Sequence, residues 1–427
     1  MYEGKVHTLF LRFAVPQMLG LLCNSVYTIV DGVFIGNRLG REAMAAAAVA
    51  VPVLEVLIAL AIAIGSGAGV LISMRLSQEK PEDARQLFQE AFWLLSAAGI
   101  VIALLGNFWL RPLTGLLGAT VEVLEEAMVY LRYIVTFAPF QLLSFLLGGM
   151  ARNDDRPKLA MTALMLGAAS NIVLDYVFMY PLNMGISGAA LATALGPIFS
   201  VLILLPHFLL KKGNLYFTWT SLRLREVRLI FLYGFPSFIM EFSIGTVTFL
   251  HNFFIVHYGY GEAGLAAYLI MGYLMLIILT LFLGLAEGLQ PVFSYFSGLG
   301  NTKRNQEIRR FSTLAFLALG LACYGAVILH AGRHLEPDEG LPLHPESPLA
   351  EPAGPGRRHH PPAHRHGRRG SGLRRHLRDP AGDGLCQQTA ETQRSESGRG
   401  QHHLRELFRL PGEDGPAGSR SLGAHPA

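Results

Sequence analysis

Nine long apolar runs constrain this chain more than any other feature of its sequence. A helix needs roughly 20 apolar residues to cross a hydrocarbon layer about 30 Å thick. Runs of that length cover residues 12–36, 44–73, 88–110, 129–150, 158–180, 187–210, 229–256, 263–291 and 309–330. They are continuously apolar and lack the alternation that strands of a membrane barrel show. The sequence therefore predicts an all-α integral membrane protein.

Composition agrees with this fold class and argues against an enzyme. Only 15% of the 427 residues are charged, whereas soluble domains carry about a quarter. The three cysteines show no metal or redox spacing. The glycine-rich runs have no phosphate-loop lysine after them and are typical of helix–helix contacts in membranes. We expect no catalytic residues, no metal site and no cofactor.

The distribution of Lys and Arg predicts the orientation in the membrane. If the N-terminus is cytoplasmic, seventeen of these residues fall on the inner side of the first nine runs and four on the outer side. Inner segments carry the excess in membrane proteins. The first run, from Phe10, is too long for a cleavable signal peptide. We expect a multi-pass protein of the plasma (cell inner) membrane with its N-terminus inside.

An internal repeat divides the chain into two halves. A shift of 220 residues aligns Ala14-Val15-Pro16 with Gly234-Phe235-Pro236, and a shift of 221 aligns Gly67 with Gly288. Both units begin with an outward helix, so their axis runs along the membrane normal. Six helices per unit predict three segments: a six-helix lobe (1–212), a basic inner loop (213–228) and a partial second lobe of three helices (229–330).

The remaining segment, 331–427, has a different composition. It contains 14 Arg and 10 of the 15 His but no Lys, Ile, Val, Met, Tyr, Trp or Asn. A natural basic arm for nucleic acid or acidic lipid uses Lys freely, and a histidine-rich metal tract does not explain the other losses. A GC-rich gene read out of frame yields this composition, so we favour a frameshift over an authentic tail or a folded domain. Whether the segment is a frameshifted product or an authentic tail, we expect it to be disordered.

Ionisable residues within spanning helices are costly and therefore mark functional candidates. Counting from the basic residues at the helix starts puts Asp31 and Asp175 at similar depth in the outer half of the membrane. Asn171 lies one turn from Asp175 on the same face, and Thr193 reaches the same level. Such a cluster holds a shared proton or a Na⁺ ion, and a structural hydrogen-bond network is the alternative.

Other candidates lie at helix bends and between the lobes. Pro16 and its repeat mate Pro236 each remove a backbone hydrogen bond and are expected to bend their helices. Glu241, five residues after Pro236, is expected to face the space between the lobes as a substrate site or second ion site. Gln290 precedes Pro291 at another expected bend. For Glu55 and Glu287 the sequence leaves function and snorkelling open.

Several of these motifs, in order, resemble one known family. The segment Asp31-Gly32-Val33-Phe34-Ile35-Gly36 resembles the first helix of multidrug and toxic compound extrusion (MATE) transporters, most closely the bacterial MepA-like group. The segment from Arg152 to Met161, followed by Asn171 to Asp175, is similar to their fourth loop and fifth helix. The segments Gly188–Thr193, Gly234–Glu241 and Gly288–Pro291 resemble their later helices.

The resemblance implies twelve helices in two lobes and export of cationic drugs by alternating access, coupled to H⁺ or Na⁺. It also implies that Asp31, Asn171, Asp175 and Thr193 form the ion site. Helices ten to twelve have no counterpart here, which puts the activity of this chain in doubt. The alternatives are a lipid-linked oligosaccharide flippase and a non-transporting membrane fragment. We expect small cationic substrates and the lipid bilayer as partners, no nucleic acid, and a monomer.

Overall fold

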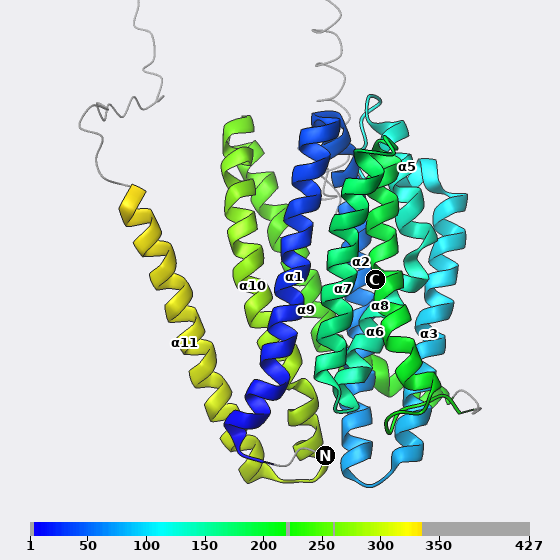
Figure 1. Ribbon diagram of the computed structural model, residues 1–427, viewed down its shortest axis with the longest axis vertical. Helices are drawn as coiled ribbons and strands as arrows, with labels where there is room; N and C mark the ends of the chain where they lie inside the picture. The colour runs from blue at the N-terminus through cyan, green and yellow to red at the C-terminus, as the bar shows by residue number, and fades with distance from the viewer. Residues whose placement is uncertain (1–3, 219–222, 259–260, 335–427) are drawn as a thin grey trace, which may run out of the picture. The chain divides into compact units, whose positions relative to one another are not determined.

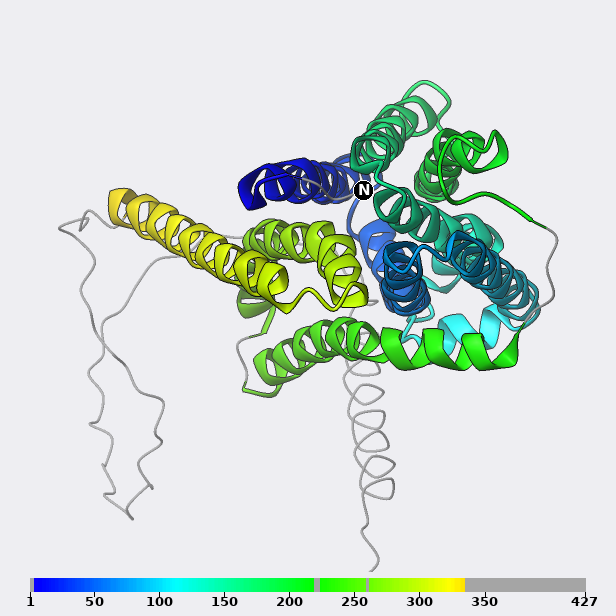
Figure 2. The ribbon, with the colours of Figure 1, turned by 90° about the horizontal axis from the view of Figure 1, so that it is seen from below.

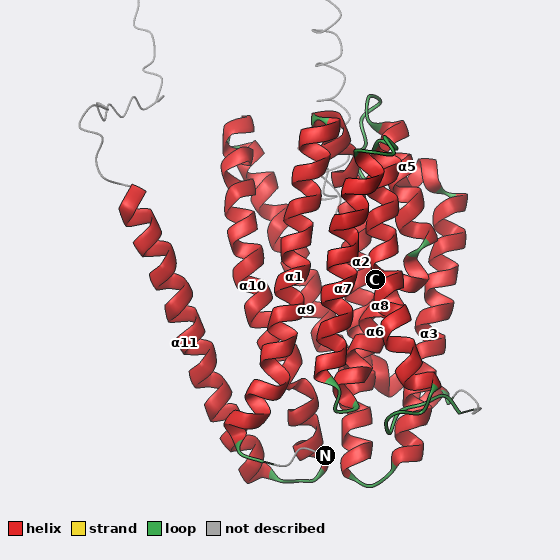
Figure 3. Cartoon of the chain, in the orientation of Figure 1, coloured by secondary structure: helices red, strands yellow, loops and turns green. Residues whose placement is uncertain are grey.

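The computed structural model describes residues 4–218, 223–258 and 261–334, and this part of the chain contains helices and loops only (Figures 1 and 3). The helices are α1 (Val6–Leu39), α2 (Arg41–Ser77), α3 (Pro81–Phe108), α4 (Leu110–Leu116), α5 (Leu124–Thr136), α6 (Ala138–Asn153), α7 (Pro157–Met179), α8 (Ile186–Leu209), α9 (Leu224–His257), α10 (Gly261–Gly298) and α11 (Thr302–His334). The predicted tail lies outside the described residues from position 335 onward.

The nine predicted spans correspond to helices that are long and apolar enough to cross a membrane. Eight single helices meet that test, and α5 with α6 makes a ninth span that is bent by 47°. Helices satisfy their backbone hydrogen bonds internally, as a lipid environment requires. The sequence predicted an unbroken fourth span over 129–150, which is wrong in shape. Pro139 in the first turn of α6 has no N–H to donate to α5, which accounts for the break.

The main hydrophobic core belongs to the first half of the chain. Its buried side chains come from α2, α3, α5, α6, α7 and α8 and include Phe88, Leu142 and Phe208. Phe88 stacks on Phe208 with ring centroids 4.9 Å apart. Two smaller clusters join α1 to α10, one through Phe13 and Val292 and the other through Ala14 and Leu285. This packing holds α7 and α8 firmly beside α5 and α6.

The two halves meet mainly along α1 with α10 and α2 with α9, and α2 also contacts α10 (Figure 2). A Cβ added to Gly288 of α10 would lie 2.6 Å from the Phe13 carbonyl oxygen and 2.8 Å from Ala14 Cα, both on α1. A Cβ added to Gly67 of α2 would lie 2.8 Å from Gly234 N and would also overlap Ile230 of α9. Both positions therefore require glycine for the backbones to approach so closely. We call these contacts the two glycine seams.

The seams obey the repeat found in the sequence. A shift of 221 aligns Gly67 with Gly288 and a shift of 220 aligns Ala14 with Gly234, so the two seams join equivalent pairs of positions. The helices match in length as well: α1 and α9 have 34 residues each, and α2 and α10 have 37 and 38. The lobe boundaries at 212 and 228 stay a prediction, since residues 219–222 of the connecting loop are outside the described part.

Candidate functional site

A polar cluster lies between α1, α5, α7 and α8, where the sequence predicted an ion site. The carboxyl groups of Asp31 and Asp175 are close enough to interact directly. The hydroxyl groups of Tyr130 and Thr193 lie 3.4 Å apart and extend the cluster toward α5 and α8. Asp175 is fully buried, and Asn171 and Tyr130 are buried almost completely. The predicted residues are therefore brought together, while their role as an ion site stays a prediction.

The cluster has unused hydrogen-bonding capacity. Within the described residues, both oxygens of Asp175, both polar atoms of the Asn171 amide and Oδ1 of Asp31 have no hydrogen-bond partner. Two carboxylates present only acceptor oxygens, so they satisfy each other only through a proton or a cation. A cavity of about 40 Å³, lined in part by Tyr27, Asn171 and Thr193, opens beside them. Its volume exceeds the roughly 15 Å³ that one water needs.

The donors present fit a hard monovalent cation as well as a proton. Carboxylate, amide and hydroxyl oxygens are the ligands that hard cations prefer. Among the described residues, no group of three or more His, Cys, Asp or Glu is placed to hold a metal ion. A site of two carboxylates with neutral oxygens is accordingly suited to H⁺ or Na⁺.

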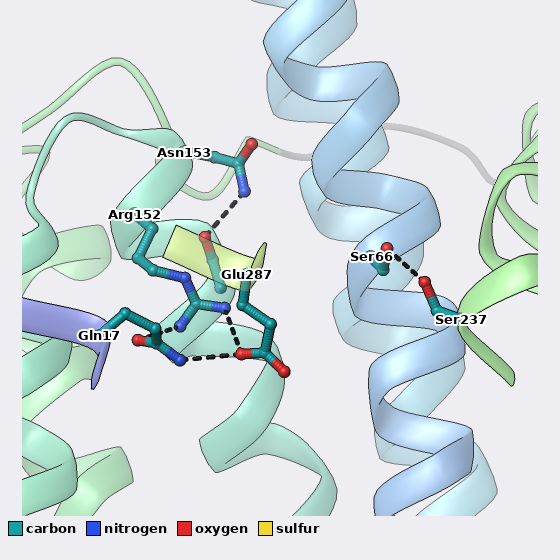
Figure 4. A network of polar contacts seen from close by, with 7 residues as sticks. Gln17, Ser66, Arg152, Asn153, Ser237 and Glu287 are labelled. Carbon is teal, nitrogen blue, oxygen red and sulfur yellow. Dashed lines mark hydrogen bonds and ion pairs between the residues drawn. The ribbon is translucent and has the colours of Figure 1, made fainter. Parts of the chain in front are cut away.

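A second polar region, which we call the central pocket, lies between the two halves. The cavity measures about 260 Å³. Its wall combines α1, α2, α6 and α7 of the first half with α9 and α10 of the second. Gln17, Arg152, Ser237, Glu287 and Gln290 supply polar groups to the lining, which is otherwise mainly apolar and glycine-rich. Ser66 and Ser237 also bridge α2 and α9 with an O–O distance of 2.9 Å (Figure 4).

Three side chains form a bonded trio at this pocket (Figure 4). Gln17 of α1 donates its amide N–H to Glu287 of α10 at 2.8 Å. Arg152, in the last turn of α6, donates to the Gln17 amide oxygen at 3.0 Å. The Arg152 and Glu287 side chains are 3.5 Å apart at their nearest N and O atoms. We call Gln17, Arg152 and Glu287 the pocket trio.

Of the two residues predicted at the second site, Gln290 and Glu241, only Gln290 lines the central pocket. Its amide nitrogen has no partner in the described chain. Glu241 directly follows the lining residue Met240 in α9 but is not itself in the lining. It lies within electrostatic range of Glu55 on α2 and of Glu287 on α10.

The two prolines expected at bends lie within continuous helices. Pro16 is in α1, directly before Gln17 of the pocket trio, and Pro236 is in α9, directly before Ser237. Each therefore frees a backbone carbonyl one turn earlier in a helix that lines the pocket. Their role as bends stays a prediction.

Sequence reasoning missed Gln17 and misplaced Arg152. Arg152 was assigned to an inner loop, but it lies in α6 and points into the central pocket. The signal available was the pair Gly148-Gly149, one turn earlier. An arginine on a helix leans back over that turn, where these glycines leave space. Glu287 was noted as ambiguous, and the structure gives it a cationic partner.

The fold and these sites define the class of protein: a helical multi-pass membrane protein with two halves around a central pocket. A MatE family model matches residues 16–177. The multidrug export protein MepA of Staphylococcus saprophyticus is 27% identical over 338 residues, which cover 78% of this chain and 72% of that protein. The chain therefore carries a MATE family domain on a MATE transporter fold.

Solved structures show the same relation. The outward-facing structure of a multidrug resistance MATE family transporter of the MOP superfamily superposes with a TM-score of 0.73 at 26% identity, covering 77% of this chain and 73% of that one. A MATE structure in a straight conformation gives a TM-score of 0.73 at 25% identity, over 78% and 74% of the two chains. The fold is therefore shared over most of the described part.

Proposed function

We propose that this protein exports small organic cations across the plasma membrane by exchange with H⁺ or Na⁺. The observation that carries the proposal is the pair Asp31 and Asp175, in which Asp31 Oδ1 and both Asp175 oxygens lack partners in the described chain. Asn171 and Thr193 of the same cluster line a small cavity. Two adjacent carboxylates in an apolar bundle repel each other when both are charged. Binding of one proton or one Na⁺ removes that repulsion, so the cluster has two states that differ by one bound cation.

A single helix connects the proposed ion site with the central pocket. α1 carries Asp31 at one level and Gln17 of the pocket trio about four turns away. Pro16 lies between Gln17 and the start of α1 and weakens the backbone ladder there. A change of charge at Asp31 then alters the position of α1 at the pocket. Coupling requires such a two-state element that both sites bias.

The charge around the central pocket favours a cationic cargo over the pyrophosphate of a lipid-linked oligosaccharide. Glu55 and Glu287 each lie within electrostatic range of Glu241. Arg152 is the single cation among the described lining residues, and Glu287 already balances it. The relatives that the chain matches are named multidrug export proteins, which supports the same reading.

Transport by the purified full-length chain in proteoliposomes tests the proposal. We expect ethidium efflux that collapses when a proton or sodium ionophore removes the corresponding gradient. Asp31→Asn and Asp175→Asn should each abolish the response to the gradient, because an amide cannot take up the coupling ion. Unchanged, gradient-driven efflux by Asp31→Asn would exclude the assigned ion site. An inactive wild-type chain would favour the membrane-fragment alternative.

Thr193→Val separates the two coupling ions. Valine keeps the shape of threonine but removes an oxygen ligand, which a Na⁺ ion needs and a proton on a carboxylate does not. We expect Na⁺-driven efflux to fall at least about tenfold if Na⁺ is the coupling ion, and H⁺-driven efflux to stay near wild type.

Topology and oligomeric state also belong to the proposal. The excess of Lys and Arg on one side supports a cytoplasmic N-terminus. Labelling of single cysteines in the α2–α3 turn and the α7–α8 turn with an impermeant reagent would distinguish the two orientations. Light scattering of the detergent-solubilised protein would test for the monomer that we expect.

A further inference from the structure

The central pocket holds a positive charge of its own where a cationic cargo would bind. The Arg152 guanidinium lies 3.5 Å from Glu287, with the two side chains 12% and 24% exposed. Glu287 belongs to α10 of the second half, and Arg152 belongs to α6 of the first half. The only pocket-lining carboxylate among the described residues is therefore occupied by an internal cation.

Local structure explains why Arg152 turns into the pocket and not toward the helix end. Its guanidinium nitrogens lie 4.0 Å and 3.7 Å from the positions that a Cβ would take on Gly148 and Gly149. These residues are four and three positions earlier on α6, which is the surface that a helical side chain covers. Two glycines in succession leave a shallow platform, and the guanidinium rests on it.

The Arg152 guanidinium is only partly hydrogen-bonded, so another cation can take its place beside Glu287. Its Nε has no hydrogen-bond partner within the described chain. Its contact with Glu287 is long at 3.5 Å, and the shorter bonds of 2.8 Å and 3.0 Å both run through Gln17. A charge-assisted pair at full strength has N–O distances of about 2.7–2.9 Å. Glu287 therefore keeps most of its capacity to bind another cation.

We propose that Glu287 is the cargo-binding carboxylate and that Arg152 is a built-in competitor which the cargo displaces. This inference rests on the proposed function and deepens it, because it assigns the binding of the cargo, an apolar organic monocation, to one residue in a mainly apolar pocket. An anion finds no uncompensated positive charge in this pocket. Arg152 thus acts on binding through Glu287 and is a positioning residue.

Displacement also breaks a connection between the halves. Gln17 and Arg152 belong to the first half, and Glu287 belongs to the second, so the pocket trio is a polar link across the pocket. A cation that takes the place of Arg152 at Glu287 removes the Arg152–Glu287 contact and weakens this link at the moment of binding. Cargo binding thus acts on the contact between the halves through one carboxylate.

Equilibrium binding of two matched hydrophobic ions to the full chain in nanodiscs tests the inference. Tetraphenylphosphonium and tetraphenylborate have nearly the same size and opposite charge. We expect Arg152→Gln to lower the Kd for tetraphenylphosphonium about tenfold, because removing an internal competitor raises the fraction of binding-competent protein. Arg152→Lys should stay near wild type, and Glu287→Gln should raise the Kd about tenfold or more.

The double variant decides between competition and a general change of the pocket. In the Glu287→Gln background, Arg152→Gln should no longer tighten binding, because the two residues act as one unit. Arg12→Gln is the matched control: it removes a guanidinium whose partner is Asp155, at 2.7 Å and outside the central pocket. It should leave both ions unaffected. Gel filtration of each variant verifies that the fold is retained.

Three results would overturn the inference. One is tetraphenylphosphonium binding to Arg152→Gln that is no tighter than binding to the wild-type chain, or that is absent from both proteins. Another is equal tightening for the borate, since a pocket that has merely widened does not distinguish charge. The third is full additivity in the double variant. Failure of the proposed function would give a different result. Gradient-driven ethidium efflux would be absent, while the variants would still show the expected changes in Kd for tetraphenylphosphonium.

Discussion

The glycine seams lead to a quantitative prediction about stability. In Gly288→Ala the new methyl group would lie 2.6 Å from the Phe13 carbonyl oxygen and 2.8 Å from Ala14 Cα. Both are backbone atoms, so no rotamer change relieves the overlap. A methyl carbon needs roughly 3.5 Å to a neighbouring heavy atom, so α10 must move away from α1 by most of an ångström. Overpacking of this kind costs about 1–3 kcal/mol.

The matched comparison uses two other glycines. Gly67→Ala should destabilise by a similar amount, because Gly67 occupies the equivalent seam against Gly234. Gly272→Ala is the control on α10: no atom lies within 4 Å of its added Cβ, and alanine is the better helix former by about 0.5–1 kcal/mol. It should be neutral or stabilising.

Thermal unfolding in detergent, followed by tryptophan fluorescence and by loss of the monodisperse gel-filtration peak, measures all three variants. We expect a lower midpoint for the Gly288 and Gly67 variants and an unchanged or higher one for the Gly272 variant. A Gly288→Ala protein as stable as wild type would refute the close approach of α1 and α10. A loss at Gly288 without one at Gly67 would refute the equivalence of the seams.

Two further predictions concern the turn between α6 and α7. Asp154→Ala should lower the free energy of unfolding by about 2–4 kcal/mol, because His207 Nε2 and the backbone N–H of Asn214, each 2.7 Å from an Asp154 oxygen, lose their hydrogen-bond partner. Urea-dependent unfolding in mild detergent measures the loss, and a change below about 0.5 kcal/mol would contradict it. Arg12→Gln should change the free energy of unfolding in the same assay by less than about 1 kcal/mol, since its ion pair with Asp155 is partly exposed. A larger loss would contradict this weak contribution.

Much of the site was predictable because the position of a residue along a spanning helix gives its depth in the membrane. Counting residues from a charged helix start fixes the depth of a side chain to within a turn. That reasoning placed Asp31, Asn171, Asp175 and Thr193 at one level, and the structure brings them together. The helical period then put Asn171 and Asp175 on one face. Depth and face were sufficient for this cluster.

The same residue counting was wrong for Arg152. It ended the fourth span at residue 150 and assigned Arg152 to the inner loop, where arginines ordinarily extend into water. Its direction depends on Gly148 and Gly149 and on the distant partners Gln17 and Glu287, which no local pattern links. The break at Pro139 was visible in the sequence, but the apolar run on both sides concealed it. The partnership of Asp154 with His207 depends on tertiary packing alone.

The seams also affect how easily the halves move against each other. At each seam glycine the two backbones approach closely, and apolar side chains such as Phe13 and Val292 pack around the α1–α10 contact. Apolar contacts have no preferred direction, so a small rolling movement of one helix on the other changes them little. The hydrogen bonds of the pocket trio do depend on direction, so the same movement has to break them. The residues that we propose to recognise cargo are therefore also among those that resist movement of the halves.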